Sequence, residues 1–172
     1  MNNRFFRAAV CAVALASMGG PLWAQYPYRE PETWKEGEVA LPARFSTDRL
    51  VTVEIEDRSS FEYGIDPDTL SVGADGVVRY VFVARSRSGA LNALYEGVRC
   101  NAAEVKVYGR WDPDSASWRT SASDDWQPMD TRGSTRRALK LAQSGLCDGK
   151  APNGSPRQIL QTLRGEHPYR LR

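Results

Sequence analysis

The chain has 172 residues, with 23 Lys and Arg against 21 Asp and Glu, and a formal net charge of +2. The excess lies in residues 1–24, which hold Arg4 and Arg7 and no acidic residue, so residues 25–172 carry 21 charges of each sign. This balance argues against attraction of the whole protein to nucleic acid. Residues 25–172 fit one domain with one modest core.

Residues 1–24 have the pattern of a secretory signal peptide. Two arginines precede an apolar run from Ala8 to about Met18, and the small residue Ala24 ends the segment. The run has about 11 residues, whereas a membrane span needs about 20. Cys11 lies inside the run, which disfavours a lipid anchor on it. We therefore expect cleavage after Ala24 and a soluble periplasmic protein without a transmembrane segment.

Two cysteines remain after residue 24, Cys100 and Cys147. In an exported chain their simplest use is one disulfide, which would close a loop of about 47 residues and contribute about 4 kcal/mol. Two cysteines without further ligands make no zinc site. A catalytic cysteine would need a histidine, and the chain offers only His167, near its C-terminus. The sequence predicts a Cys100–Cys147 disulfide, no metal and no cofactor.

The first half of the mature chain reads as an extended leader followed by strands. Proline and charge over residues 25–44 predict a leader on the surface. Alternating apolar residues predict strands, and the turn residues 73–76 between two β-rich runs predict a hairpin. The expected strands are, in chain order, 50–56, 61–65 (the weakest), 70–72, 77–85, 91–100, 105–111 and 118–121.

A change of hydrophobic period then predicts a helix. The segment STRRALKLAQS, residues 134–144, has Ser134 where an N-cap should be and Gly145 where a C-cap should be. Residues 149–172 carry five basic residues and one Glu, which predicts a solvated tail that could include a short helix from Ser155-Pro156. The expected fold is α+β: one domain over 25–148, in which one main helix packs on an antiparallel sheet of about five strands.

A long segment resembles a known family. Residues 71–100, SVGADGVVRYVFVARSRSGALNALYEGVRC, are similar to the CNP-one-like domain family, most clearly at DGVVRY (75–80) and YEGVRC (95–100). The resemblance covers roughly Trp34 to Cys147. It implies a small exported protein of Gram-negative bacteria whose function is not established, and it supplies no catalytic residues.

A search for catalytic motifs finds no phosphate loop, nucleophile elbow or zinc helix. His167 has Glu166 beside it, but both lie in the C-terminal tail, where ordering is poor. Asp124 and Asp125 could pass for a paired-carboxylate sugar site, although adjacent carboxylates on a loop more often form a solvated turn.

Three tryptophans could form a ligand surface. Trp111, Trp118 and Trp126 are spaced through the second half of the chain and could stack on carbohydrate. Tryptophans at strand positions more often cover the edge of a small core, and we favour that interpretation.

Arg79 and Glu96 are charges inside apolar strands. A four-residue loop over 86–89 would place them opposite each other, so we predict a structural charge pair between them. A two-residue loop over 88–89 would place Val98 opposite Arg79 and leave Glu96 as a functional candidate.

The four-residue loop would also pair Tyr80 with Tyr95 on the other face of the strands. Arg99, near the strand end, is expected to reach solvent or a second acidic residue.

Two classes of function follow from these residues. We favour a non-catalytic periplasmic protein that binds an envelope protein or cell-wall component, with no nucleic-acid partner. The alternative is a hydrolase of cell-wall or carbohydrate material that acts through Glu96, Asp124 or Asp125. A hydrolase of this kind needs a concave pocket that holds at least two of these carboxylates.

Overall fold

The computed structural model describes residues 33–55 and 60–166. The predicted signal peptide with its cleavage site, Cys11 and His167 lie outside these ranges. The chain divides into two units, Met1–Thr33 and Trp34–Arg172, and the following description concerns the second.

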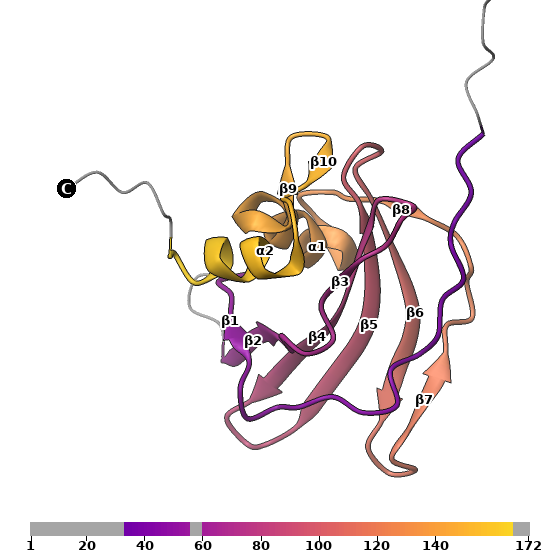
Figure 1. Ribbon diagram of the computed structural model, residues 1–172. Coiled ribbons are helices and arrows are strands. Elements are labelled where there is room, and N and C mark those ends of the chain that lie inside the picture. The colour runs from indigo at the N-terminus through magenta and orange to yellow at the C-terminus, as the bar shows by residue number, and fades with distance from the viewer. Residues whose placement is uncertain (1–32, 56–59, 167–172) are drawn as a thin grey trace, which may run out of the picture. The chain divides into compact units, whose positions relative to one another are not determined.

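An antiparallel sheet of eight strands forms the centre of this unit (Figure 1). The strand order is β1-β2-β4-β5-β6-β7, while β3 pairs with β4 and β8 pairs with β6. The strands are β1 (Val51–Thr52), β2 (Phe61–Ile65), β3 (Ser71–Val72), β4 (Val77–Ser86), β5 (Leu91–Arg99), β6 (Glu104–Asp112), β7 (Ser117–Thr120) and β8 (Gln127–Pro128).

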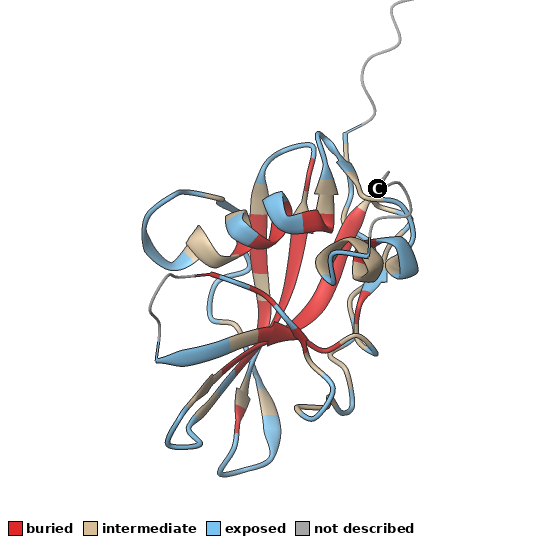
Figure 2. Ribbon diagram, turned by 90° about the vertical axis from the view of Figure 1, so that its left-hand side faces the viewer, coloured by how far each residue is buried: buried red, intermediate tan, exposed pale blue. Residues whose placement is uncertain are grey.

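The two faces of the sheet are covered by different parts of the chain. On the helix face, Tyr80, Phe82 and Leu94 pack beneath the helices. On the leader face, Val81 and Tyr95 pack beneath the leader, residues 34–50. Strands β4 and β5 are therefore buried on both sides, which explains their nearly continuous apolar sequence. Figure 2 shows these buried strands behind the helices, and their hairpin ends extend beyond the helical layer.

The helical layer consists of two short helices and their connections. A 3-10 turn (η1, Gly133–Thr135) leads into α1 (Arg136–Leu141), which ends in a π-helical turn (η2, Ala142–Leu146). Strands β9 (Cys147–Asp148) and β10 (Ala151–Pro152) form a separate hairpin before α2 (Pro156–Leu163).

The ends of these helices largely follow the sequence signals. Gly145 terminates the helical segment with φ of 145°, a conformation that favours glycine. Ser155 caps α2 in a capping box with Gln158, as the Ser-Pro start suggested. Ser134 does not cap α1: it lies in η1, and Thr135 takes the N-cap position.

The predicted fold class is confirmed in its antiparallel sheet and packed helix, but its counts are wrong. The sheet has eight strands rather than about five: all seven expected strand segments contribute a strand to it, β1 to β7, and the unexpected β8 is added. A second helix, α2, also packs on the core through Ile159, which is fully buried. The short helix that the basic tail could include is therefore present and packed, while residues 149–151 and 164–166 around it are exposed.

The β4–β5 hairpin has a register between the two that were considered. Arg79 lies opposite Gly97, and Tyr80 lies opposite Glu96. Three residues, 87–89, connect Ser86 to Ala90, whose carbonyl accepts a 2.9 Å hydrogen bond from the Ser86 N–H. The last loop residue, Gly89, has a positive φ of 90°, which fits a three-residue hairpin loop.

This register separates the two charges. Successive strand residues point to opposite faces, so Arg79 lies on the leader face and Glu96 on the helix face. The predicted Arg79–Glu96 pair is wrong, as is the predicted pairing of Tyr80 with Tyr95.

Candidate functional site

Arg79 and Asp75 form the centre of an ion network on the leader face. The Arg79 guanidinium, only 8% exposed, donates to both Asp75 carboxylate oxygens, at 3.1 and 2.5 Å. Asp75 also accepts from the backbone N–H groups of Val77 and Gly37. Burial alone would raise the pKa of Asp75, but these hydrogen bonds outweigh it and lower the pKa to about 2. Asp75 thus joins the β3–β4 turn to the leader.

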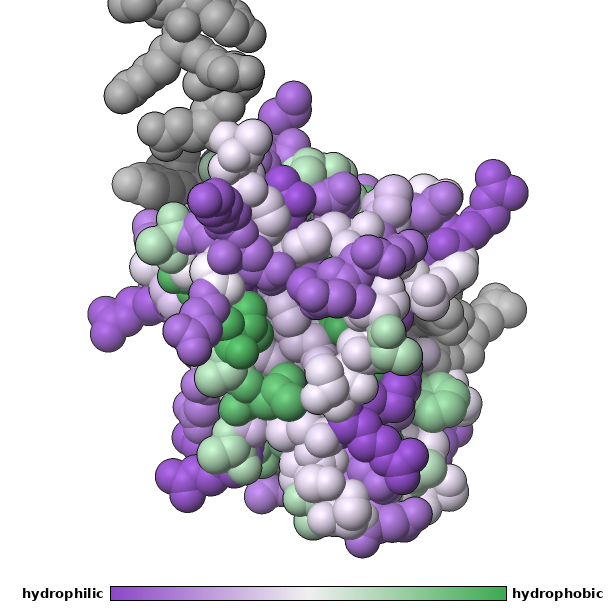
Figure 3. Space-filling view, turned by 90° about the vertical axis from the view of Figure 1, so that its right-hand side faces the viewer, coloured by the Kyte–Doolittle hydropathy of each residue, from purple (hydrophilic) through white to green (hydrophobic). Residues whose placement is uncertain are grey.

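Glu36 extends this network to β6. Its carboxylate accepts from Lys106 Nζ at 2.9 Å and from the Tyr108 hydroxyl at 2.6 Å. Lys106 also pairs with Asp124 at 2.5 Å. Burial opposes the charge on Lys106, but the hydrogen bonds to Asp124 and Glu36 raise its pKa. Figure 3 shows this side of the molecule, where a small hydrophobic patch lies among charged side chains.

A polar pocket of about 460 Å³ lies on the leader face. We call it the leader pocket. Glu36, Lys106, Tyr108 and Asp124 are among its lining residues. Both carboxylates contact Lys106, and Asp124 belongs to an exposed loop. Asp125 is exposed and accepts a hydrogen bond from Ser123.

Two of the candidate tryptophans pack against the leader. Trp111 and Trp118 lie with ring centroids 5.1 and 5.5 Å from that of Phe45. The Trp118 indole N–H donates to the Pro42 carbonyl at 2.8 Å. Their packing supports the interpretation that they cover a small core. The leader packs against the two indole rings on this face of the sheet.

Trp126 belongs to a second aromatic group at the other end of the leader. It contacts Trp34 edge to face at 5.8 Å. The Arg99 guanidinium carbon lies 3.7 Å from the ring centroid of Trp34 and 5.4 Å from that of Trp126, a cation–π arrangement. Arg99 also pairs with Glu104 at 2.9 Å. Arg99 was expected to reach either solvent or a second acidic residue, and it contacts an acidic residue, Glu104.

Glu96 is the buried charge of the helix face. Its side chain has no exposed surface. One carboxylate oxygen, Oε1, accepts hydrogen bonds from Arg137 of α1, from Nε at 2.9 Å and from Nη2. The Tyr80 hydroxyl donates to the other oxygen at 3.3 Å. Burial raises the pKa of Glu96, and Arg137 opposes that effect. This arrangement ties β5 to the helical layer.

A second pocket opens on the helix face, at the edge of the helical layer. Its volume is about 310 Å³, and we call it the arginine pocket. The pocket is lined by Ile55, Phe61, Tyr63, Phe82, Ala84, Asn92, Leu94, Arg110, Gly133, Ser134, Arg136 and Arg137. Among the described residues of this lining, the ionisable groups are the three arginines and the Tyr63 phenol, and no carboxylate is present.

Strand register explains the composition of the arginine pocket. Phe82, Leu94 and Arg110 form one row across β4, β5 and β6. Ala84 and Asn92 form the next row. An apolar sheet surface therefore continues past the helices and ends at a guanidinium group.

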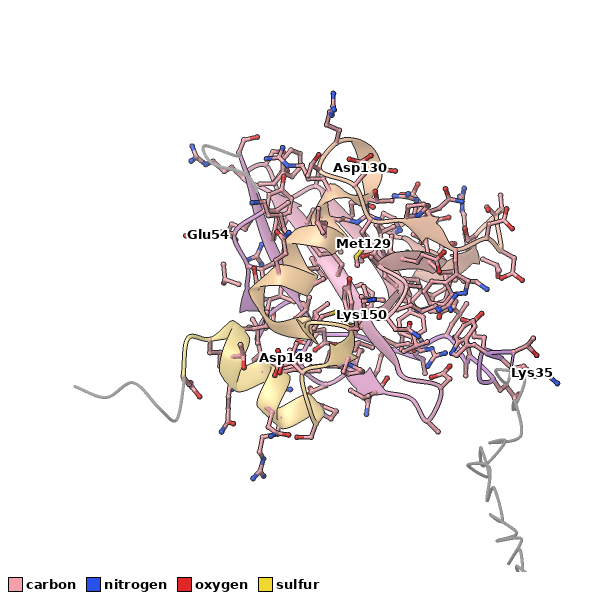
Figure 4. All side chains as sticks on the ribbon, turned by 90° about the horizontal axis from the view of Figure 1, so that it is seen from above. Lys35, Glu54, Met129, Asp130, Asp148 and Lys150 are labelled. Carbon is pink, nitrogen blue, oxygen red and sulfur yellow. A yellow bond between two sulfur atoms is a disulfide. The ribbon has the colours of Figure 1, made fainter. Side chains whose placement is uncertain are left out.

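The disulfide between Cys100 and Cys147 is confirmed, with Cα atoms 5.7 Å apart. It joins the residue after β5 to the first residue after η2, as expected from the predicted helix end. An apolar pocket of about 370 Å³ lies beside it and includes Met129. Figure 4 shows Met129 beside α1, whereas Lys35 and Glu54 point outward.

The sequence reasoning missed the arginine pocket. Arg136 and Arg137 lie in the predicted helix 134–144 and Arg110 in the predicted strand 105–111, but none of the three was singled out as a site residue. One available signal was Glu96 itself, because a carboxylate in an apolar strand needs a cation from the layer packed over it. The neighbouring arginine pair at the start of the predicted helix is a source of such a cation.

The described residues contain no helix long and apolar enough to span a membrane. Over the same residues, no group of three or more His, Cys, Asp or Glu side chains is arranged to hold a metal ion.

Comparison with known proteins gives one result. No curated protein and no solved structure matches the chain. A family model, described as the CNP1-like family, matches residues 29–164. The match includes both motifs that carried the resemblance, Asp75–Tyr80 and Tyr95–Cys100, and it extends through α2. The chain belongs to the CNP1-like family, the CNP-one-like family that its sequence resembles.

Proposed function

We propose that this protein is an exported, non-catalytic binding module of the cell envelope, and that the arginine pocket is its binding site. One observation carries the proposal: an apolar sheet surface continues beyond the helical layer and is rimmed by three arginines. A concave site with an apolar floor and a few fixed polar groups is the usual form of a small-molecule site.

The geometry favours binding over hydrolysis. Glu96 is enclosed by Tyr80 and Arg137 on the helix face, while Asp124 lines the leader pocket on the opposite face. A pair of catalytic carboxylates must flank one scissile bond, within about 5–10 Å of each other. The carboxylates of the hydrolase alternative are therefore distributed over two faces, and Asp124 is held in an ion pair with Lys106.

Export is the second part of the proposal. Residues 1–24 are proposed to act as a cleaved signal peptide that delivers the mature chain to the periplasm. The Cys100–Cys147 disulfide supports this location, because disulfides persist in oxidising compartments. Mass spectrometry of the protein from a periplasmic fraction should find Gln25 as the first residue. Retention of residues 1–24, or a lipid on Cys11, would contradict the proposal.

Binding can be tested by nuclear magnetic resonance. Mature ¹⁵N-labelled protein is titrated with the low-molecular-mass fraction of a periplasmic extract. We expect saturable amide shift changes that cluster at residues of the arginine pocket, such as Asn92, Arg110 and Ser134. Changes confined to the leader pocket would contradict the assigned site.

The hydrolase alternative has its own measurement in the same samples. Release of soluble fragments from purified cell-wall glycan is followed for the wild type and for Asp124→Asn. Release that depends on Asp124 would contradict the non-catalytic proposal. We expect no release above a heat-treated control.

A further inference from the structure

We infer that the arginine pocket takes a small apolar carboxylate, an acid with a hydrocarbon body whose carboxylate binds Arg110; this inference rests on the function proposed above. It is carried by the shape of the pocket, by the residues of its floor and by the sign of its charges.

The size of the pocket indicates a small ligand. Its volume of about 310 Å³ lies at the lower end of the range of small-molecule sites, about 300–1,000 Å³. Such a volume accommodates one short hydrocarbon chain or one ring system. A polymer or a lipid with two long chains would extend far outside it.

The floor of the pocket is suited to hydrocarbon. Phe82 and Leu94 lie side by side in register on the sheet, and Tyr63 stacks on Phe82 with ring centroids 5.9 Å apart. Phe61 extends this aromatic surface outward. It is 44% exposed and is the one exposed large hydrophobic residue among the described parts of the chain. A bound apolar body would remove this surface from water.

The charges of the pocket indicate an anion. Among the described lining residues, Arg110, Arg136 and Arg137 carry charge and no carboxylate is present. Arg137 is neutralised from behind by Glu96 and also donates to the Ser134 carbonyl. Its guanidinium is therefore fixed in place as part of the wall rather than free to turn toward a ligand.

Arg110 is the residue that we assign to the ligand. Its side chain is exposed on the helix face, opposite Leu94. Nη1 donates to the Asn92 side-chain oxygen at 2.9 Å, which holds the guanidinium at the rim. Among the described residues no carboxylate pairs with Arg110, and the Nε and Nη2 atoms of its guanidinium form a fork. Such a fork matches the two oxygens of a carboxylate.

The probe for this inference is sodium octanoate, titrated into the mature protein by calorimetry. Octan-1-ol has nearly the same body without the charge, and acetate has the charge without the body. We expect octanoate to bind one to one and about tenfold more tightly than either control, since only octanoate uses both the floor and Arg110. Octan-1-ol binding as tightly as octanoate would overturn the carboxylate assignment.

Two matched variants locate the interaction. Arg110→Gln should weaken octanoate binding about tenfold and leave octan-1-ol unchanged. Arg85→Gln is the control. It removes the same charge from the leader face of the sheet, where Arg85 of β4 pairs with Glu62, and it should leave the affinity for octanoate unchanged. Equal affinities of Arg110→Gln and wild type for octanoate would overturn the inference.

The outcomes separate the ligand class from the proposed function. Octanoate that fails to bind, while the periplasmic fraction still shifts Asn92 and Ser134, would overturn the carboxylate class and leave the binding function standing. Octanoate shifts confined to the leader pocket would overturn the site itself.

Discussion

Arg79 and Glu96 lie on opposite faces of the β4–β5 hairpin, although each is buried in an apolar strand. Arg79 pairs with Asp75 and approaches Glu36 of the leader, at 3.8 Å. Glu96 pairs with Arg137 of α1. Arg79 thus finds its partners in the β3–β4 turn and the leader, and Glu96 finds its partner in the helical layer. Through Asp75 and Glu36 on one face and Arg137 on the other, the leader and the helices are joined to the same central strands.

The first prediction concerns the coupling of these charges. Replacing Glu96 by Gln should destabilise the protein by about 3 kcal/mol, because Arg137 would lose its carboxylate in a partly buried site. Arg137→Gln should cost a similar amount, and the double variant should cost much less than the sum. Urea unfolding of the four proteins measures this coupling.

Arg79→Gln provides the control for that cycle. Its effect should add to that of Glu96→Gln, since the two side chains share no partner and lie on different faces. Strong coupling between Arg79 and Glu96 would contradict the observed register.

The second prediction is a dependence of stability on pH through Asp75. Its folded-state pKa of about 2 lies below the ordinary value of 3.8. A lowered carboxylate pKa stabilises the folded state above the unfolded pKa, and the contribution is lost as the pH falls through the folded pKa. The contribution is about 2 kcal/mol, at about 1.4 kcal/mol per pH unit.

Asp75→Asn isolates this contribution. The difference in unfolding free energy between wild type and Asp75→Asn should be constant above about pH 5 and should shrink by about 2 kcal/mol toward pH 2. Glu96, with its raised pKa, has the opposite sign: it lowers stability as the pH rises through its folded pKa. Because both proteins keep Glu96, its effect cancels in the comparison. A difference that does not vary with pH would refute the role of Asp75.

Local signals in the sequence predicted much of the fold. Val51, Val53 and Ile55 are buried while Thr52 and Glu54 are exposed, as their alternation indicated, although only Val51–Thr52 is a regular strand. The 73–76 turn and the start of a short helix at Ser155-Pro156 were also predicted correctly. These features depend on residues within a few positions of one another, so one stretch of sequence contains the whole signal.

Features that depend on distant residues could not be predicted. The segment Ser86–Gly89 is compatible with loops of two, three or four residues, and one residue of difference moves Glu96 to the other face. Its partner Arg137 lies 41 positions away. The arginine pocket combines side chains from β2, β4, β5, β6 and the start of α1. Local sequence signals do not show how these strands are aligned with one another.

The third prediction concerns the disulfide. Changing both Cys100 and Cys147 to Ser should lower the unfolding free energy by about 2–5 kcal/mol. The two cysteines are 47 positions apart, and without the bond the loop between them is no longer closed in the unfolded chain. The loss should be largest in the helical layer, since the bond joins η2 to β5. Hydrogen exchange should show greater loss of protection in α1 than in the β4–β5 hairpin. Equal stability of the oxidised wild type and the double variant would contradict this.

The last prediction explains the glycine in YEGVRC. Gly97 lies on the leader face opposite Arg79, directly beneath the ring of Tyr108. A Cβ atom there would lie 2.5 Å from the Tyr108 hydroxyl oxygen and 2.9 Å from both a ring carbon and a Val77 methyl. Tyr108 cannot move away freely, because its hydroxyl donates to Glu36. Gly97→Ala should therefore destabilise the protein by about 1–3 kcal/mol through overpacking.

Tyr108→Ala tests whether this ring is the cause. In that background the added methyl group has space on the side of Tyr108, and only the Val77 contact remains. The cost of Gly97→Ala, measured by urea unfolding, should fall to less than half of its value in the wild type. An unchanged cost would place the constraint in the backbone of β5 or at Val77 instead. A reduced cost would show that this glycine is required so that Tyr108 can pack over the strand and reach Glu36 of the leader.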